Sequence, residues 1–132
     1  MNRMLVSALL AGSLAATAFA PALAEDYASG AIKTMDTAKG EILTDALGMA
    51  LYTFDKDAPG VSNCDGDCAM KWPPVTAPAG AKADGEFSLV TRKDGSQQWA
   101  FNGKPLYLWQ GDKKAGDISG DGVGGVWHLA KE

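Results

Sequence analysis

The sequence has 132 residues, enough for one compact domain, and its charge balance narrows the classes of partner. Arg3 is the one charged residue before position 25, so residues 25–132 hold 11 of the 12 basic and all 16 acidic side chains, a formal charge of about −5. Phosphate binding needs a basic face, whereas the lysines and arginines here are scattered. We therefore expect no nucleic-acid partner and no attraction to an anionic membrane.

The first 24 residues have the parts of a secretory signal peptide. Arg3 supplies a positive charge, residues 4–20 are nearly all small or apolar, and Ala22-Leu23-Ala24 fits the small-x-small cleavage rule. We expect cleavage after Ala24, with Ala20 as the alternative.

The same segment is a poor membrane anchor, because small and polar residues interrupt its apolar run and Pro21 ends it. The first cysteine of the chain is Cys64, so a lipid-anchored form has no attachment residue near the cleavage site. The predicted product is a periplasmic or secreted protein without a stable membrane anchor.

The rest of the chain contains an internal repeat with an offset of 55 positions. Sliding the sequence over itself by that offset aligns seven identical residues without a gap. The aligned pairs are Gly30 with Gly85, Gly40 with Gly95, Gly48 with Gly103, Leu51 with Leu106, Tyr52 with Tyr107, Asp57 with Asp112, and Trp72 with Trp127. We predict two copies of one unit, copy one at 30–77 and copy two at 85–132, with a tail at 25–29 and a connector at 78–84.

Each copy is predicted to form three short strands followed by a long loop. Apolar and polar residues alternate within short segments that glycine-containing turns separate. The segments are 32–35, 41–45 and 50–54 in copy one, and 86–92, 97–101 and 105–109 in copy two. Leu47 is poorly suited to positive φ, so a type II turn or a bulge is predicted at Leu47-Gly48 and at Asn102-Gly103.

Both faces of the third strand are apolar. In copy two, Tyr107 and Trp109 point one way and Leu106 and Leu108 the other, the pattern of a strand covered on two sides. A three-stranded meander cannot supply that cover alone. We therefore predict an all-β fold, in which two three-stranded meanders pack with pseudo-twofold symmetry into one small sandwich or barrel-like domain.

Two segments carry one motif that resembles a known family. Tyr52-Thr-Phe54-Asp-Lys-Asp57 and Tyr107-Leu-Trp109-Gln-Gly-Asp112 resemble the Y-x-(F/W/Y)-x-x-D motif of a bacterial family of secreted repeats of unknown function, also described as predicted lipoproteins. The segment from Cys64 to Pro74 resembles the family's C-x-G-x-C-A-x-x-W-P-P signature, and 124–128 resembles its closing segment. The resemblance implies a tandem repeat of the cell envelope with no assigned activity.

Cys64 and Cys68 are the two cysteines, and in an exported chain they most simply form one disulfide. The ring is short, so its expected contribution is about 2 kcal/mol, and it pins a turn at Gly66. The alternative is a copper or redox role for the cysteines. Further soft ligands for that role are His128, Met35, Met49 and Met70.

The motif aromatics lie two apart, so Tyr52 with Phe54, and Tyr107 with Trp109, share one strand face. They form either cross-strand core packing or an aromatic platform for a ligand. In the core interpretation the tyrosine hydroxyls need acceptors, and the motif aspartates Asp57 and Asp112 are suitable.

The remaining aligned aromatics are Trp72 and Trp127. Pro73-Pro74 follows Trp72, and a residue before proline avoids the helical region, so the segment is extended. Trp72 either plugs the domain beneath its loop or, if exposed to solvent, anchors a protein-docking strip.

Aspartates in glycine-rich loops suggest a calcium site, because Ca²⁺ prefers hard oxygen ligands. The candidates are Asp55, Asp57, Asp65 and Asp67 in copy one and Asp112, Asp117 and Asp121 in copy two, with His128 as a further metal ligand. Asp and Gly also dominate ordinary turns, where the carboxylate accepts nearby amides. We therefore expect no cofactor, with calcium or copper as the alternatives.

No catalytic constellation accompanies these residues. An acyl-transfer site at His128 needs a nucleophile and an orienting acid, and no such motif surrounds Ser62 or Ser119. The sequence predicts a non-catalytic binding or structural protein of the envelope, whose partner is an envelope protein or a small ligand. The alternative is a metal-handling or redox accessory protein.

Overall fold

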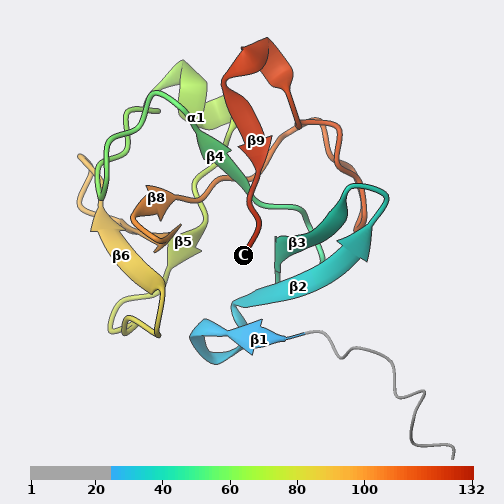
Figure 1. Cartoon of the computed structure of the whole chain (residues 1–132). Helices are drawn as coiled ribbons and strands as arrows, with labels where there is room; N and C mark the ends of the chain where they lie inside the picture. The colour runs from blue at the N-terminus through green and yellow to red at the C-terminus, as the bar shows by residue number, and fades with distance from the viewer. Residues whose placement is uncertain (1–24) are drawn as a thin grey trace, which may run out of the picture.

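The computed structural model describes residues 25–132, and the predicted signal peptide at 1–24 lies outside them. Within this range strands are the main regular structure, with one α-helix of five residues. The described strands form three small sheets and no closed barrel (Figure 1). The predicted all-β class is therefore confirmed, in its sandwich form.

Copy one begins with a hairpin of β2 (Ile32–Thr37) and β3 (Gly40–Asp45). Gly40 closes the turn with φ 94°, a left-handed conformation that glycine adopts without steric cost. After the hairpin come β4 (Tyr52–Phe54), α1 (Asp67–Lys71) and β5 (Thr76–Ala77). The predicted tail forms β1 (Asp26–Tyr27), which pairs with β2, and is followed by the 3-10 turn η2 (Ala28–Gly30).

Copy two repeats this order, with shorter strands in its hairpin. The hairpin is β6 (Phe87–Thr91) with β7 (Gln97–Phe101), followed by β8 (Lys104–Pro105), the 3-10 turn η3 (Val123–Gly125) and β9 (Trp127–Leu129). The strand predicted over 105–109 ends early, because Tyr107 bridges to Tyr52 and Pro74 of copy one instead of continuing its own hairpin.

The last segment of each copy crosses to the other copy. β9 pairs antiparallel with β4, and β5 pairs with β7. Backbone hydrogen bonds follow the same symmetry: Asp55 N donates to Val126 O at 2.9 Å, and the equivalent Gln110 N donates to Lys71 O at 2.9 Å. In Figure 1 the β4–β9 pair lies between the β2–β3 hairpin and the sheet of copy two. The predicted pseudo-twofold packing is confirmed.

Two apolar clusters form the interior, and each contains residues of both copies. Leu51 and Leu106 belong to the first cluster, beside Phe87 and Trp99. Tyr52 and Tyr107, their neighbours in the chain, belong to the second. The central segments are therefore covered on both sides, as their two apolar faces predict.

The second strand of each copy departs from the 55-residue offset. Ile32 pairs with Asp45 in copy one, whereas Phe87 pairs with Phe101 in copy two. Equivalent residues of this strand are therefore 56 positions apart instead of 55. The gap-free alignment is wrong here, and Gly40 and Gly95 are not equivalent. The turn between β6 and β7 is one residue longer than its counterpart, and the turn after β7 is one residue shorter.

That shorter turn also corrects the predicted turn type. Asn102 and Gly103 have φ values of 51° and 82°, and two positive values are typical of a type I′ turn. In copy one only Gly48 of the Leu47-Gly48 pair has positive φ, at 84°, as predicted. The two copies therefore use different turns because Asn tolerates the left-handed region and Leu does not.

None of the helices in residues 25–132 has the length and apolar character needed to cross a membrane.

Candidate functional site

The two motif tyrosines meet at the pseudo-twofold axis. Tyr52 N donates to Tyr107 O at 2.8 Å, and Tyr107 N donates to Tyr52 O at 2.9 Å. Each residue is the equivalent of the other in the repeat, and both are fully buried. The motif therefore provides the central contact between the copies.

The tyrosine hydroxyls also cross between the copies. Tyr52 Oη donates to Asp112 Oδ2 and Tyr107 Oη donates to Asp57 Oδ2, each at 2.7 Å. The acceptors are thus the motif aspartates, each from the other copy. Burial, followed by the hydrogen bond to Asp112, raises the pKa of Tyr52 well above its ordinary value. Burial also raises the pKa of Tyr107, and both phenols stay protonated as donors.

Four aromatic rings stack across the same axis. The distance between ring centroids is 4.2 Å from Phe54 to Trp127, 3.8 Å from Trp127 to Trp72, and 4.1 Å from Trp72 to Trp109. The order is symmetric, because Phe54 aligns with Trp109 and Trp72 with Trp127. Trp72 and Trp127 are buried at 4% and 5% exposure, so Trp72 is not the anchor of an exposed docking strip. The motif aromatics lie in core packing, with the outer two rings half-buried.

Loop one, residues 55–66, positions Asp57 through a chain of hydrogen bonds. Arg92 Nη1 donates to Ser62 Oγ at 2.9 Å, and Ser62 Oγ donates to Tyr107 Oη at 2.6 Å. Asn63 N donates to the second oxygen of Asp57 at 2.6 Å. Burial raises the pKa of the Asp57 carboxyl, while these donors and the Arg92 charge oppose that rise.

Arg92 is the buried cation of this network, with 8% of its surface exposed. Its guanidinium also donates to Gln98 Oε1 at 2.8 Å, to Cys64 O at 2.8 Å and to Asp65 Oδ1 at 3.3 Å. A disulfide joins Cys64 to Cys68 directly beside it. Loop one is therefore held both covalently and by a buried charge.

Loop two, residues 110–121, positions Asp112 without either device. Ser119 donates its backbone N–H and its hydroxyl to Asp112 Oδ1, at 2.9 and 2.7 Å. Gly120 N donates to Tyr52 Oη at 3.1 Å, and a β-carbon at Gly120 would lie 2.9 Å from the Tyr52 ring. The loop is thus packed so closely on the phenol that only glycine fits.

The other aspartates of loop two accept local donors. Asp117 accepts the backbone N–H groups of Lys113 and Lys114, as turn chemistry predicts. Asp121 accepts Leu129 N and the ammonium of Lys39, and this ammonium holds the pKa of Asp121 below its ordinary value.

His128 lies on the exposed face of the β4–β9 pair. Its Nε2 is 2.8 Å from Asp55 Oδ2, and both side chains are about half exposed. Thr53 lies directly opposite His128 in the register. Two recesses of about 300 and 260 Å³ border this face, and both are lined by Thr53, Asp55, Asn102 and Lys104.

The predicted metal ligands are not gathered at one point. Asp57 and Asp112 lie at the two phenols, Asp55 pairs with His128, and Asp65 pairs with Arg92 and Lys93. Asp67 begins α1. In the described range the grouped ligand atoms belong instead to the exposed Glu25, Glu41 and Glu132. The absence of a cofactor stays a prediction, with calcium and copper as its alternatives.

Three buried residues that support the two loops have no signal in the repeat. Arg92 and Gln98 complete the loop one network, and Gly120 closes loop two. Their counterparts at the 55-residue offset are Thr37, Leu43 and Asp65, so the repeat comparison passes over them. Arg92 is the single arginine of residues 25–132, which is the one sequence feature that singles it out.

Comparison with known families accounts for the motif and its duplication. A family model described as a secreted repeat of unknown function matches residues 33–76 and 88–131, two spans that start 55 residues apart and cover more than half of the chain. A search of curated proteins and a search of solved structures found no match. Two matched copies, joined in this structure through their shared Tyr–Asp motif, show that the chain belongs to the family of secreted repeats of unknown function.

Proposed function

We propose that this protein is an exported, non-catalytic binding protein in which the repeat motif builds the scaffold and does not contact the ligand. The observation that carries the proposal is the exchange of motif contacts between copies. Both phenols, both motif carboxylates and the two central indoles are occupied with one another. Ligand contacts then fall to residues that differ between the copies.

The exposed histidine supports the non-catalytic assignment. Its Nε2 faces Asp55, which gives it an orienting acid, but no hydroxyl in residues 25–132 donates to its ring. An acyl-transfer site needs such a nucleophile within hydrogen-bond reach of its base. The buried tyrosines are no substitute, because their raised pKa values keep them protonated.

The proposed setting is the periplasm or the extracellular space, and the partner is a small ligand or an envelope protein. The family description as a secreted repeat supports export. The acidic balance of the chain supports a partner other than nucleic acid.

Two measurements on untagged protein from its native compartment test this proposal. Elemental analysis should find no stoichiometric calcium, copper or zinc. Hydrolysis of p-nitrophenyl acetate should not exceed that of free imidazole at equal concentration. Stoichiometric metal would overturn the proposal in favour of metal handling.

The esterase arm has a matched control. A rate well above imidazole that disappears in His128→Ala, and persists in Ser119→Ala, would identify a catalytic site at His128 and overturn the non-catalytic assignment.

A further inference from the structure

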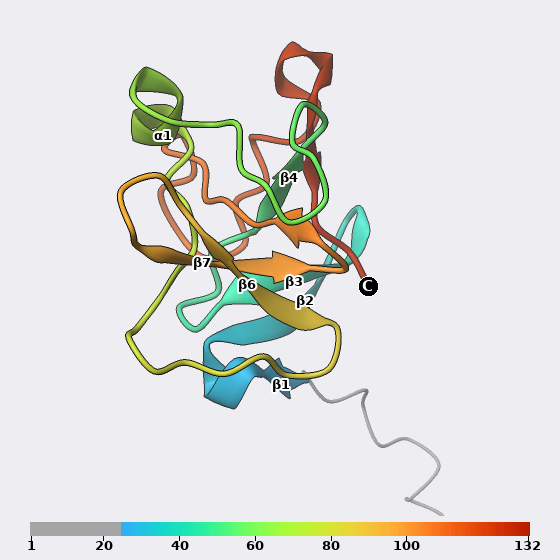
Figure 2. The same cartoon turned by 90° about the vertical axis from the view of Figure 1, so that its left-hand side faces the viewer.

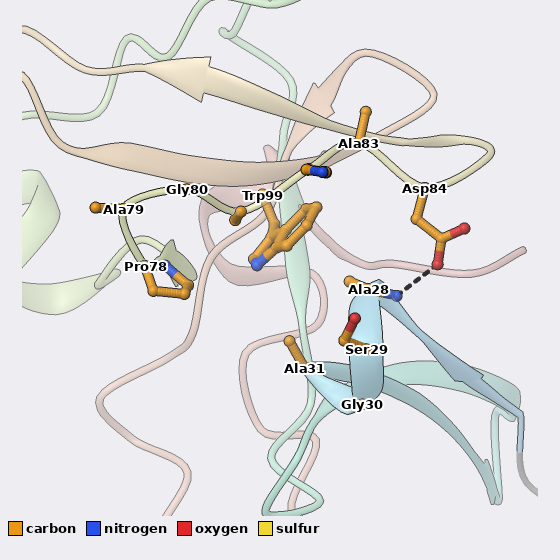
Figure 3. A pocket seen from close by; sticks show the side chains of 12 residues that line it. Ala28, Ser29, Gly30, Ala31, Pro78, Ala79, Gly80, Ala83, Asp84 and Trp99 are labelled. Atoms are coloured by element: carbon orange, nitrogen blue, oxygen red, sulfur yellow. Dashed lines mark hydrogen bonds between the residues drawn. The ribbon is translucent and has the colours of Figure 1, made fainter.

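A cavity of about 750 Å³ lies on the far side of the molecule from the motif loops, between η2 and the connector. Its walls are residues 28–31, residues 78–84 and the Trp99 ring of β7 (Figure 3). Asp84 Oδ2 accepts Ala28 N at 2.8 Å and ties the two walls together. In Figure 2 the connector and β1 lie together at the same end of the molecule.

The Trp99 indole N–H lacks a partner. Trp99 is 2% exposed, and its Nε1 is the one buried side-chain nitrogen or oxygen of the described residues without a hydrogen bond. Figure 3 shows the nitrogen edge of the ring directed into the space between Pro78 and Ala31. Buried donors are almost always satisfied, so this one indicates an acceptor absent from the protein itself.

The opposite wall has a strained backbone. Ala28 and Ser29 have φ values of 53° and 59°, in the left-handed region that side chains with a β-carbon disfavour. Such strain persists only where surrounding contacts impose it, and it clusters at ligand sites. The backbone strain at Ala28 and Ser29 is an observation independent of the unpaired indole, and both features line the same cavity.

The connector provides a way in. Within residues 78–83 of the described chain one backbone hydrogen bond, from Ala81 N to Pro78 O at 3.1 Å, holds the segment. None of these residues belongs to a strand, and most of them are exposed. A ligand oxygen can therefore reach the indole by displacing Pro78 and its neighbours without breaking a sheet.

The lining defines the chemistry of the ligand. Eight of the twelve lining residues are alanine, proline or glycine, and the side chains of Ser29 and Lys82 are exposed to solvent. Asp84 is occupied by Ala28, and the indole offers a donor and no acceptor. We propose that this cavity binds a small, uncharged, mainly apolar molecule through a carbonyl oxygen that accepts the Trp99 indole hydrogen bond. The inference rests on the proposed binding function and names its ligand class.

Cyclohexanone is a suitable probe, with cyclohexene as the matched ring that lacks the acceptor. The ¹⁵N-labelled exported protein is titrated with each, and the Trp99 indole signal is assigned by its absence in Trp99→Phe. Cyclohexanone should move that proton downfield in a saturable way. Cyclohexene at equal concentration should not.

Variants separate the donor from the rest of the cavity. Trp99→Phe keeps an aromatic ring and should weaken cyclohexanone binding about 5–10-fold, followed at the Ala28 and Ala31 amides. Trp109→Phe, in the distant ring stack, should leave the affinity unchanged. Ala31→Leu fills the space beside the indole nitrogen and should abolish binding, which decides the matter if Trp99→Phe does not fold.

An indole signal that cyclohexanone leaves in place, an equal downfield shift with cyclohexene, or full affinity in Ala31→Leu would overturn the proposal. A negative result here, with no metal and no hydrolysis, would leave the non-catalytic assignment intact and remove this site alone.

Discussion

Loop one and loop two deliver the same bond by different means. Each places an aspartate 2.7 Å from the phenol of the other copy. Loop one relies on a disulfide and on buried Arg92, whereas loop two relies on Ser119 and on the absence of a side chain at Gly120. The motif therefore specifies the bond between copies, and the loop composition specifies how that bond is supported.

Equivalent substitutions at the pseudo-twofold axis should have equal effects on stability in the two copies. These are the largest effects that we expect. Trp72→Ala and Trp127→Ala each remove a buried indole that stacks on the other, and each should lower the free energy of unfolding by about 3–5 kcal/mol. The double variant should lose less than the sum, since either change removes the shared contact. Urea unfolding measures all three, and strongly unequal single variants would contradict the symmetric role.

Removing the buried cation tests the support that belongs to loop one. Arg92→Met removes one of the two donors to Ser62 Oγ and leaves Gln98 Oε1 and the Cys64 carbonyl without a donor, and should destabilise by about 2–4 kcal/mol. Lys93→Met is the matched control, because Lys93 also contacts Asp65 but is 81% exposed, and it should change stability by less than about 1 kcal/mol. Equal effects of the two changes would show that the buried network is unimportant.

A methyl group tests the support that belongs to loop two. Gly120→Ala places a β-carbon 2.9 Å from the Tyr52 ring and 3.0 Å from Trp109, and should destabilise by about 1–3 kcal/mol through overpacking. Asp65→Asn, at the equivalent position of loop one, should be milder, because a side chain already fits there and the amide oxygen can still accept from Arg92. Thermal unfolding of both variants provides the comparison, and a neutral Gly120→Ala would refute the close packing.

Reduction should act on loop one alone. Opening the short Cys64–Cys68 ring should lower the free energy of unfolding by about 2 kcal/mol. Urea titrations with and without dithiothreitol measure this, and Cys64→Ser with Cys68→Ser should give the same loss. Stability unchanged by reductant would mean that Arg92 holds the loop unaided.

The two loops should also differ in the sign of a small pH effect. Asp121 of loop two has a lowered pKa, so its contribution is present above the ordinary value of 3.8 and is lost as pH falls through the lower folded value. Asp57 of loop one has a raised pKa, so its contribution is present below 3.8 and is lost as pH rises through the higher folded value.

Asp121→Asn should therefore reduce the loss of stability toward low pH, and Asp57→Asn should reduce the loss above 3.8. Urea unfolding across the acid range measures both slopes. Identical pH profiles for the two variants would contradict the assigned shifts.

Much of the fold follows from the repeat, because glycine, aromatic and aspartate positions recur at a fixed spacing. That spacing predicts the strands, the symmetry and the acceptors of the tyrosine hydroxyls. It does not tell which copy supplies the acceptor: Asp57 follows Tyr52 in the chain, yet it accepts Tyr107. Only the crossing of β9 onto β4 decides that exchange, and it is a long-range pairing.

Residues that occur in only one copy of the repeat could not be predicted from the sequence. Arg92 closes the loop one network from the turn that follows β6 of the other copy, and the sequence presents Trp99 as an ordinary core aromatic on an alternating strand. The one-residue displacement of β7 is hidden for a related reason. A longer turn and a shorter one cancel, so the motif residues beyond them return to register.

The crossing of β9 and β5 between copies has a consequence for how such a chain can arise. A single copy on its own would leave β4 unpaired and its Tyr and Asp without partners, and a second identical copy would satisfy both. The arrangement is thus that of a twofold dimer whose subunits have been joined end to end. The seven-residue connector replaces an association that depends on concentration with one set by its own length, and frees the two halves to acquire different loops.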